Sequence, residues 1–215
     1  MNFKHYIITR NLYSPEYEFL NERVELIKKF TIPSLANQVC KNFVWLVTGD
    51  HGLIEDDFLG INYIVEKSFK KYIQNDSENY DYIITTRLDN DDYLLPNYIA
   101  EVQSVYFHSS TDLLIDLRGY RADTRYFDFY EDTSYLRMPS PFISLVEKVI
   151  PGSVLKTVYF DQHTLMKNHF KLISLDVVGW LQIIHDHNKL MNRPKSDVER
   201  RGNKITCPDF LKNVL

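Results

Sequence analysis

The amino-acid sequence predicts an α/β fold with a mostly parallel sheet flanked by helices. Short apolar runs, typical of strands, alternate with longer stretches of helical period. These runs are apolar along their whole length, as are strands covered on both faces. A chain of 215 residues with 44% hydrophobic residues can also bury a large core without a disulfide or a metal. No internal repeat is visible, which favours one main domain.

The expected elements follow in order along the chain. The first strand is residues 4–9 (KHYIIT), and a helix is expected at 21–30, where apolar residues recur in three-residue steps. Pro33 interrupts this pattern and can begin a second helix that reaches Val39. The next expected elements are strands at 43–47, 61–65, 82–86 and 112–117, with a helix at 96–107.

The second half departs from this alternation. Residues 119–141 are rich in Tyr, Arg and Asp without a clear period, which predicts an irregular or antiparallel insertion. Residues 141–149 fit either a helix or an extended segment, and late strands are expected at 172–176 and 179–185. From Met191 the chain becomes polar and charged, so we expect a domain at 1–192 and a loosely held charged tail at 193–215.

Charge and composition exclude several classes of protein. A net charge of −4 argues against a nucleic-acid binder, which usually carries a basic surface. The N-terminus has no apolar stretch long enough for a signal peptide, and no run reaches the length of a membrane span. Cys40 and Cys207 lack metal-ligand spacing, as expected for reduced thiols. We therefore expect a cytoplasmic protein with at most peripheral membrane contact.

The strongest local feature is an acidic cluster at residues 85–92 (TTRLDNDD), directly after an apolar strand. Ligands bind at the carboxyl ends of strands in open α/β sheets, and crowded carboxylates suit a hard cation such as Mg²⁺ or Mn²⁺. The alternative is a solvated acidic turn that starts the next helix. The motifs of P-loop hydrolases, Rossmann dehydrogenases, zincins and α/β-hydrolases are absent, and the spacing does not fit an EF-hand.

The acidic cluster and several other segments together resemble a known family. TTRLDNDD resembles the DxD motif of glycosyltransferases with the GT-A fold, where it likewise follows a hydrophobic strand. The ordered set is similar to the rhamnosyltransferase family of bacteria over about residues 4–192: HYIITR at 5–10, TIPSL at 31–35 with Gln38, NFVW at 42–45, PF at 141–142, SLVE at 144–147, and WLQIIH at 180–185 with Asn188. The resemblance implies a GT-A-like sheet with the irregular insertion on the acceptor side.

The same resemblance implies a metal site. It makes Asp91 the ligand of a Mn²⁺ or Mg²⁺ ion and Asp89 its partner, which contacts the ion, the ribose or the sugar. Late histidines often supply a third ligand in this fold, and His185 occupies the matching position. In an extended segment His185 and His187 point to one face, so a zinc site of the HxH type is the rival interpretation.

Donor-binding residues are expected at the ends of the first strands and beside the acidic cluster. Thr9 and Arg10 end the first strand, and the resemblance implies that Asp50, after the second, bonds the nucleotide base. Asp50 is equally well explained as a turn residue. Arg87 either contacts the donor diphosphate or pairs with a neighbouring carboxylate.

An inverting reaction needs a base for the acceptor hydroxyl, and the candidates are Glu147, Asp161 and His163. Asp161 lies where GT-A enzymes build the acceptor side, although it also fits a capping role. The aromatic run at 126–130 (YFDFY) either stacks on sugar rings or packs in the interior.

These observations predict a metal-dependent glycosyltransferase that moves rhamnose or another hexose from a nucleoside-diphosphate donor to a glycan or lipid-linked acceptor. One alternative is an inactive module that binds the nucleotide sugar. Another is a nucleotidyltransferase that uses the same acidic pair and releases pyrophosphate.

Overall fold

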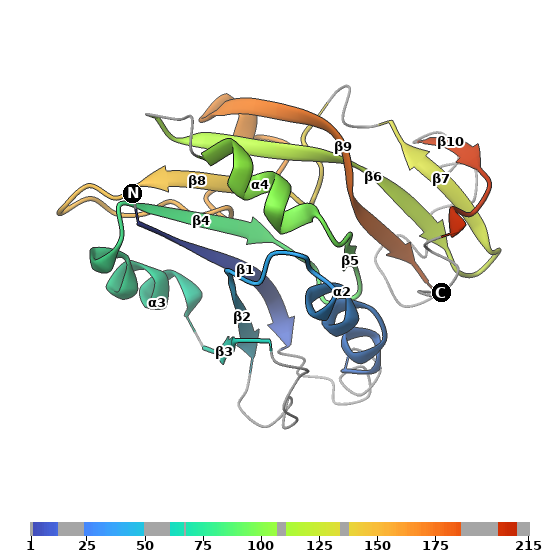
Figure 1. Cartoon of the computed structure of the whole chain (residues 1–215), viewed down its shortest axis with the longest axis horizontal. Coiled ribbons are helices and arrows are strands. Elements are labelled where there is room, and N and C mark those ends of the chain that lie inside the picture. The colour runs from blue at the N-terminus through green and yellow to red at the C-terminus, as the bar shows by residue number, and fades with distance from the viewer. Residues whose placement is uncertain are drawn as a thin grey trace.

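A computed structural model describes residues 2–12, 24–49, 61–66, 68–106, 111–133, 138–185 and 202–209. In these ranges the ten strands join one mixed sheet in the order β10-β7-β6-β8-β4-β1-β2-β3, with β9 paired to β6 and β5 paired to β9 (Figure 1). The predicted α/β class is confirmed.

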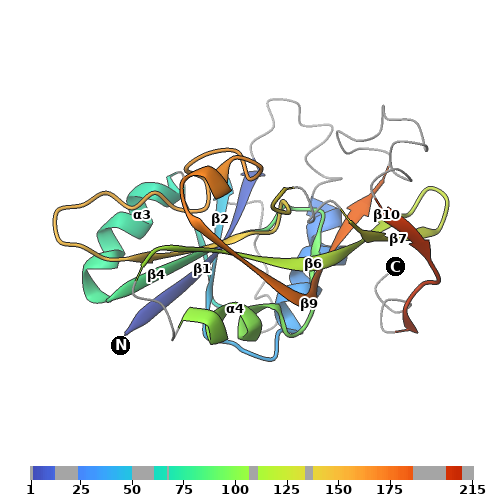
Figure 2. The ribbon, with the colours of Figure 1, turned by 90° about the horizontal axis from the view of Figure 1, so that it is seen from above.

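The central part of the sheet is parallel. β1 (Phe3–Leu12) lies between β2 (Val44–Gly49) and β4 (Tyr82–Arg87), and β3 (Tyr63–Val65) extends it beyond β2, with every pair parallel. Seen from above, α3 (Phe69–Asp76) lies on one face, and α2 (Ile32–Ala36) and α4 (Tyr98–Tyr106) lie on the other (Figure 2). Covered faces explain why these strands are apolar throughout.

Antiparallel strands continue the sheet on the other side of β4. β8 (Ser144–Lys148) pairs antiparallel with both β4 and β6 (Leu113–Asp123), and β7 (Asp128–Asp132) forms a hairpin with β6. The insertion is therefore antiparallel where it is described, and the undecided segment at 141–149 is extended at β8. β5 (Tyr93–Leu94), which the sequence did not predict, pairs with β9.

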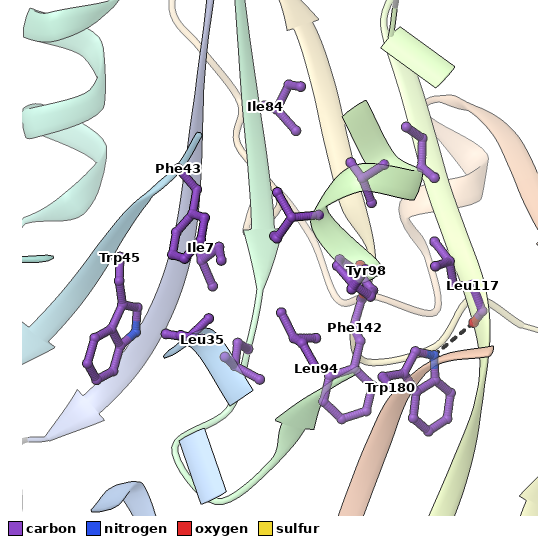
Figure 3. Packing of buried hydrophobic residues seen from close by; sticks show 14 of the residues in the cluster. Ile7, Leu35, Phe43, Trp45, Ile84, Leu94, Tyr98, Leu117, Phe142 and Trp180 are labelled. Atoms are coloured by element: carbon purple, nitrogen blue, oxygen red, sulfur yellow. Dashed lines mark hydrogen bonds between the residues drawn. The ribbon is translucent and has the colours of Figure 1, made fainter. Parts of the chain in front are cut away.

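The two late strands expected from the sequence are one strand, β9 (Lys171–Ile184), which runs parallel to β6. Its register shifts on either side of Arg118, because β9 has extra residues between Leu175 and Trp180 that no residue of β6 opposes. At this point Trp180 donates its indole N–H to the Leu117 carbonyl at 2.8 Å and stacks on Phe142 (Figure 3). A Cβ atom on Gly119 would collide with this indole, so glycine is required there.

Short helices complete the layers. A π-helical turn at Ile27–Thr31 leads directly into α2, so the predicted helix continues through Pro33 rather than breaking before it. The other short helical turns are 3-10 helices at Ser77–Asn79 and Met166–Asn168. Among the described helices, none is long and apolar enough to span a membrane.

Part of the predicted tail packs on the domain. β10 (Gly202–Ile205) pairs antiparallel with β7, and Lys204 forms an ion pair with Asp128 at 2.5 Å. This segment is therefore not loosely held, because its backbone hydrogen bonds extend the sheet. The domain boundary after residue 192 remains a prediction.

Candidate functional site

The acidic cluster forms a turn between β4 and β5. Asp92 is 2% exposed and accepts a hydrogen bond from the backbone N–H of Ile183 at 2.8 Å, which fastens the turn to β9. Burial raises the pKa of Asp92, and the charges of Asp91 and Asp89 raise it further. Asp92 therefore has a structural role, and the charges of both Asp91 and Asp89 reach it.

Asp91 and His185 meet across the site. His185 Nε2 lies 3.0 Å from Asp91 Oδ2 although 94 residues separate the two in sequence. Pairing of β5 with β9, with Tyr93 opposite Leu181, brings the end of β9 beside the acidic turn. Both side chains are mostly buried, at 18% exposure for Asp91 and 11% for His185. His187, the other half of the rival zinc motif, lies outside the described residues.

Asp89 is turned toward Arg87. The Arg87 guanidinium lies 3.2 Å from Asp89 Oδ2, and the Asp89 side chain is 36% exposed. The sequence left two contacts open for Arg87, a donor diphosphate or a neighbouring carboxylate. This structure shows the ion pair with the Asp89 carboxylate. Exchanging this partner for a diphosphate oxygen would keep the guanidinium in a charge-assisted hydrogen bond.

A tyrosine that the sequence analysis missed joins the two arginines. Arg10 Cζ lies 4.5 Å from the centroid of the Tyr159 ring, and Arg87 Cζ lies 5.5 Å from it. The Tyr159 hydroxyl donates to the Ile8 carbonyl at 3.4 Å, so the ring is fixed to β1. Its only sequence signal was its position two residues before Asp161. The arrangement holds two cationic groups at the carboxyl ends of β1 and β4.

These residues suit an ion that is shared with a ligand. Within the part of the chain that the structure describes, no group of three or more His, Cys, Asp or Glu side chains could hold a metal ion by itself. Asp91 and His185 offer one carboxylate and one imidazole, with Asp89 close by. Mg²⁺ and Mn²⁺ are often held by one or two carboxylates together with substrate phosphates, so the carboxylates of Asp91 and Asp89 fit such an ion, whereas the imidazole of His185 suits softer metals than Mg²⁺.

One of the predicted donor contacts, Thr9, stands apart from this geometry. Thr9 is completely buried, and its hydroxyl accepts the indole N–H of Trp45 at 3.0 Å. The Thr9 side chain is therefore part of the core and holds the Trp45 indole in place. Asp50 lies outside the described residues.

Glu147 has a structural role. It lies on β8 opposite Ile83, near the start of β4 and so at the opposite end of that strand from the acidic turn. Its carboxylate accepts the backbone N–H groups of Lys156 and Thr157 at 2.7 and 2.8 Å. A side chain that is 3% exposed and holds a loop in this way is poorly placed to reach an acceptor.

Asp161 and His163 lie on the segment that carries Tyr159. Asp161 accepts the backbone N–H of Gln162 at 2.7 Å and faces His169 Nε2 at 3.0 Å. The first of these bonds, with help from the second, lowers the pKa of Asp161, so the carboxylate is ionised at neutral pH but is a weak base. Burial and the charge of Arg87 lower the pKa of His163 to about 4, so this imidazole is neutral at pH 7.

A scan against protein-family models and a search of curated proteins both find no match. Solved structures similar to this chain include S. aureus TarS 1–349 in complex with UDP-GlcNAc, at 14% identity and a TM-score of 0.47, over 89% of this chain and 61% of that chain. A protein of Desulfovibrio desulfuricans G20 described as a nucleotide-diphospho-sugar transferase is similar at 10% identity and a TM-score of 0.46, over 94% of this chain and 91% of that chain. This chain therefore spans about three fifths of the TarS fragment. Both TM-scores are below 0.5, so neither likeness assigns a function to this chain.

Proposed function

We propose that this chain is a metal-dependent glycosyltransferase, which moves rhamnose or another hexose from a nucleoside-diphosphate donor to a glycan or lipid-linked acceptor. The observation that carries the proposal is the contact of Asp91 with His185 at 3.0 Å beside Asp89. The sequence resemblance independently implies that these three residues are ligands of Mn²⁺ or Mg²⁺.

Each residue of the site then has a role. Asp91 and His185 would hold the ion, with Asp89 as a further candidate ligand. The ion would neutralise charge on the diphosphate leaving group. Arg87 and Arg10 donate charge-assisted hydrogen bonds to phosphate or ribose oxygens, and the Tyr159 ring keeps their guanidinium groups in place.

Asp161 is the proposed base for the acceptor hydroxyl in an inverting reaction. Its lowered pKa keeps the carboxylate ionised but also makes it a weak base, so the assignment rests on its place on the segment that carries Tyr159 and not on its pKa. His169, at 3.0 Å, orients that carboxylate. Glu147 is not needed for this step, because it already binds two backbone N–H groups.

Binding of nucleotide sugars tests the proposal. A panel of nucleoside-diphosphate sugars, with rhamnose donors and UDP-GlcNAc among them, is screened by thermal shift with and without Mn²⁺, because a ligand of the folded state raises stability. Asp91→Asn and His185→Ala are each expected to weaken Mn²⁺-dependent donor binding at least about tenfold. Asp176→Asn is the matched control, because its side chain is 88% exposed and its partner is Arg118.

The products separate the alternatives. Release of a nucleoside diphosphate supports a glycosyltransferase, whereas release of pyrophosphate identifies a nucleotidyltransferase. Mn²⁺-dependent donor binding without turnover of any donor identifies an inactive binding module. Unchanged Mn²⁺-dependent donor affinity in a folded Asp91→Asn protein contradicts the metal site.

A further inference from the structure

The turn between β6 and β7 lies at the rim of the candidate site. Thr124 donates both its backbone N–H and its hydroxyl to the Ile184 carbonyl, at 2.9 and 3.0 Å. Ile184 immediately precedes His185, which contacts Asp91. Both views of the ribbon show this turn near the end of β9 (Figures 1 and 2).

Hydrogen bonds to a buried carboxylate hold the turn. Asp123, which is 1% exposed, accepts hydrogen bonds from the backbone N–H and the guanidinium of Arg125, at 3.1 Å for the backbone and 2.6–2.8 Å for the side chain. The Arg125 guanidinium in turn lies 5.4 Å from the centroid of the Tyr126 ring. A buried carboxylate thus orients the arginine, and the arginine orients an aromatic ring.

Two aromatic side chains of the turn face solvent. Tyr126 is 52% exposed and Phe127 is 82% exposed, whereas Phe129 and Tyr130 of the same aromatic run are buried. Phe127 also has a φ of 54°, a left-handed conformation that is disfavoured for a residue with a side chain. Because Phe127 is exposed, its ring contributes little hydrophobic stabilisation to the fold. Neither packing nor backbone preference therefore explains why a phenylalanine stands at this position.

We propose that Tyr126 and Phe127 form a platform that binds the acceptor glycan. This inference rests on the proposed function and names the acceptor class for the same site. The apolar C–H face of a sugar ring packs against an aromatic face, while neighbouring polar groups bind its hydroxyls. Because Thr124 donates to the Ile184 carbonyl, a glycan held at this turn would lie near the end of β9, where His185 follows.

Among the described residues beside the turn, charge favours a glycan over an anionic membrane as the occupant. Arg125 is paired with Asp123 at 2.6 Å, and Lys204 on the adjacent strand is paired with Asp128 at 2.5 Å. Each of these basic groups is thus matched by a carboxylate, so they do not form the cationic surface that attracts acidic lipids.

Phe127→Gly and Tyr126→Ala test the platform, with Val154→Ala as a control because Val154 is similarly exposed, at 81%, on a different loop. Phe127→Gly suits the left-handed backbone, so it removes the ring without straining the turn. Binding of each protein is measured on an array of bacterial oligosaccharides in the presence of Mn²⁺. The two platform variants are expected to bind at least about tenfold more weakly than the wild type, and the control is expected to bind unchanged.

Donor binding is measured in parallel by thermal shift. Loss of glycan binding with donor binding intact supports the platform. Glycan binding that both variants retain, or an absence of glycan binding by the wild type, overturns it. Sedimentation of the wild type, but not of the two variants, with phosphatidylcholine–phosphatidylglycerol vesicles, without glycan binding, also overturns it and indicates a membrane contact. Failure of the wild type to bind any nucleotide sugar refutes the proposed function instead, independently of these outcomes.

Discussion

A buried histidine makes the stability of this protein depend on pH. His5 Nδ1 lies 3.1 Å from Gln103 Nε2, an atom that can only donate, so Nδ1 is an acceptor. The other ring nitrogen donates to Thr86 Oγ1 at 2.7 Å, which makes His5 neutral. Burial lowers the pKa of His5 to about 3, whereas a histidine in the unfolded chain titrates near about 6.5.

The sign and size of the effect follow from these two pKa values. Below about pH 6.5 the unfolded chain binds a proton at this position and the folded chain does not, so acid favours unfolding. The contribution of His5 to stability is therefore complete above about pH 6.5 and is lost progressively as the pH falls toward about 3. Between pH 7 and pH 5 this amounts to about 2 kcal/mol, or about 1 M in the urea midpoint for an m value of about 2 kcal/mol/M.

Urea unfolding at pH 7 and pH 5 measures this loss. His5→Gln removes the titrating group, so its free energy of unfolding should fall about 2 kcal/mol less than that of the wild type over this range. His169→Gln is the control, because the His169 side chain is 41% exposed. If wild type and His5→Gln lose the same stability between the two pH values, His5 is not held neutral in the folded protein.

Substitutions at three further positions separate structural from functional residues. Glu147→Gln is expected to cost about 1–3 kcal/mol of unfolding free energy in urea while donor binding persists, because one charged acceptor of two backbone N–H groups is weakened; a variant of full stability without turnover would instead support a catalytic role. Gly119→Ala should lower stability by about 1–3 kcal/mol in the same assay, because its Cβ meets the Trp180 indole, and an unchanged midpoint would contradict this packing. Tyr159→Ala should weaken donor binding about tenfold in the thermal-shift titration, because both guanidinium groups lose their ring, while Tyr159→Phe should stay within about twofold. Equal losses in the two variants would mean that the hydroxyl, rather than the ring, is what matters.

Local patterns were sufficient for most of the strands. The central strands are buried on both faces, so they are continuous apolar runs that end in polar residues, and β1, β2 and β4 lie where these runs occur. The gap left between the predicted strands at 172–176 and 179–185 was wrong, because the chain continues there as a single strand, β9, with a shift in register. The short strand β5 carries too few residues to give a periodic signal, and only its pairing with β9 defines it.

The residue types of the candidate site were visible in the sequence, and the family resemblance already joined His185 to Asp91, but no local pattern showed which residues are neighbours. The carboxylates of the acidic cluster are close together in the sequence, so Asp89 and Asp91 could be chosen without a structure. Their partners depend on which strands pair. Pairing of β5 with β9 brings His185 to Asp91, and the loop after β8 brings Tyr159 to the two arginines. No local pattern encodes these long-range contacts.

Residues close together in the chain were enough to predict the α/β class, the central strands and the acidic turn, because each of these depends on local order. Which polar groups face a ligand depends instead on how the strands and loops pack. Glu147 and Thr9 are polar residues of suitable chemistry, yet one holds a backbone loop and the other holds a tryptophan. The aromatic run at 126–130 likewise divides into exposed Tyr126 and Phe127 and buried Phe129 and Tyr130. Burial is a property of the packed sheet, and so it separates neighbours that the sequence cannot distinguish.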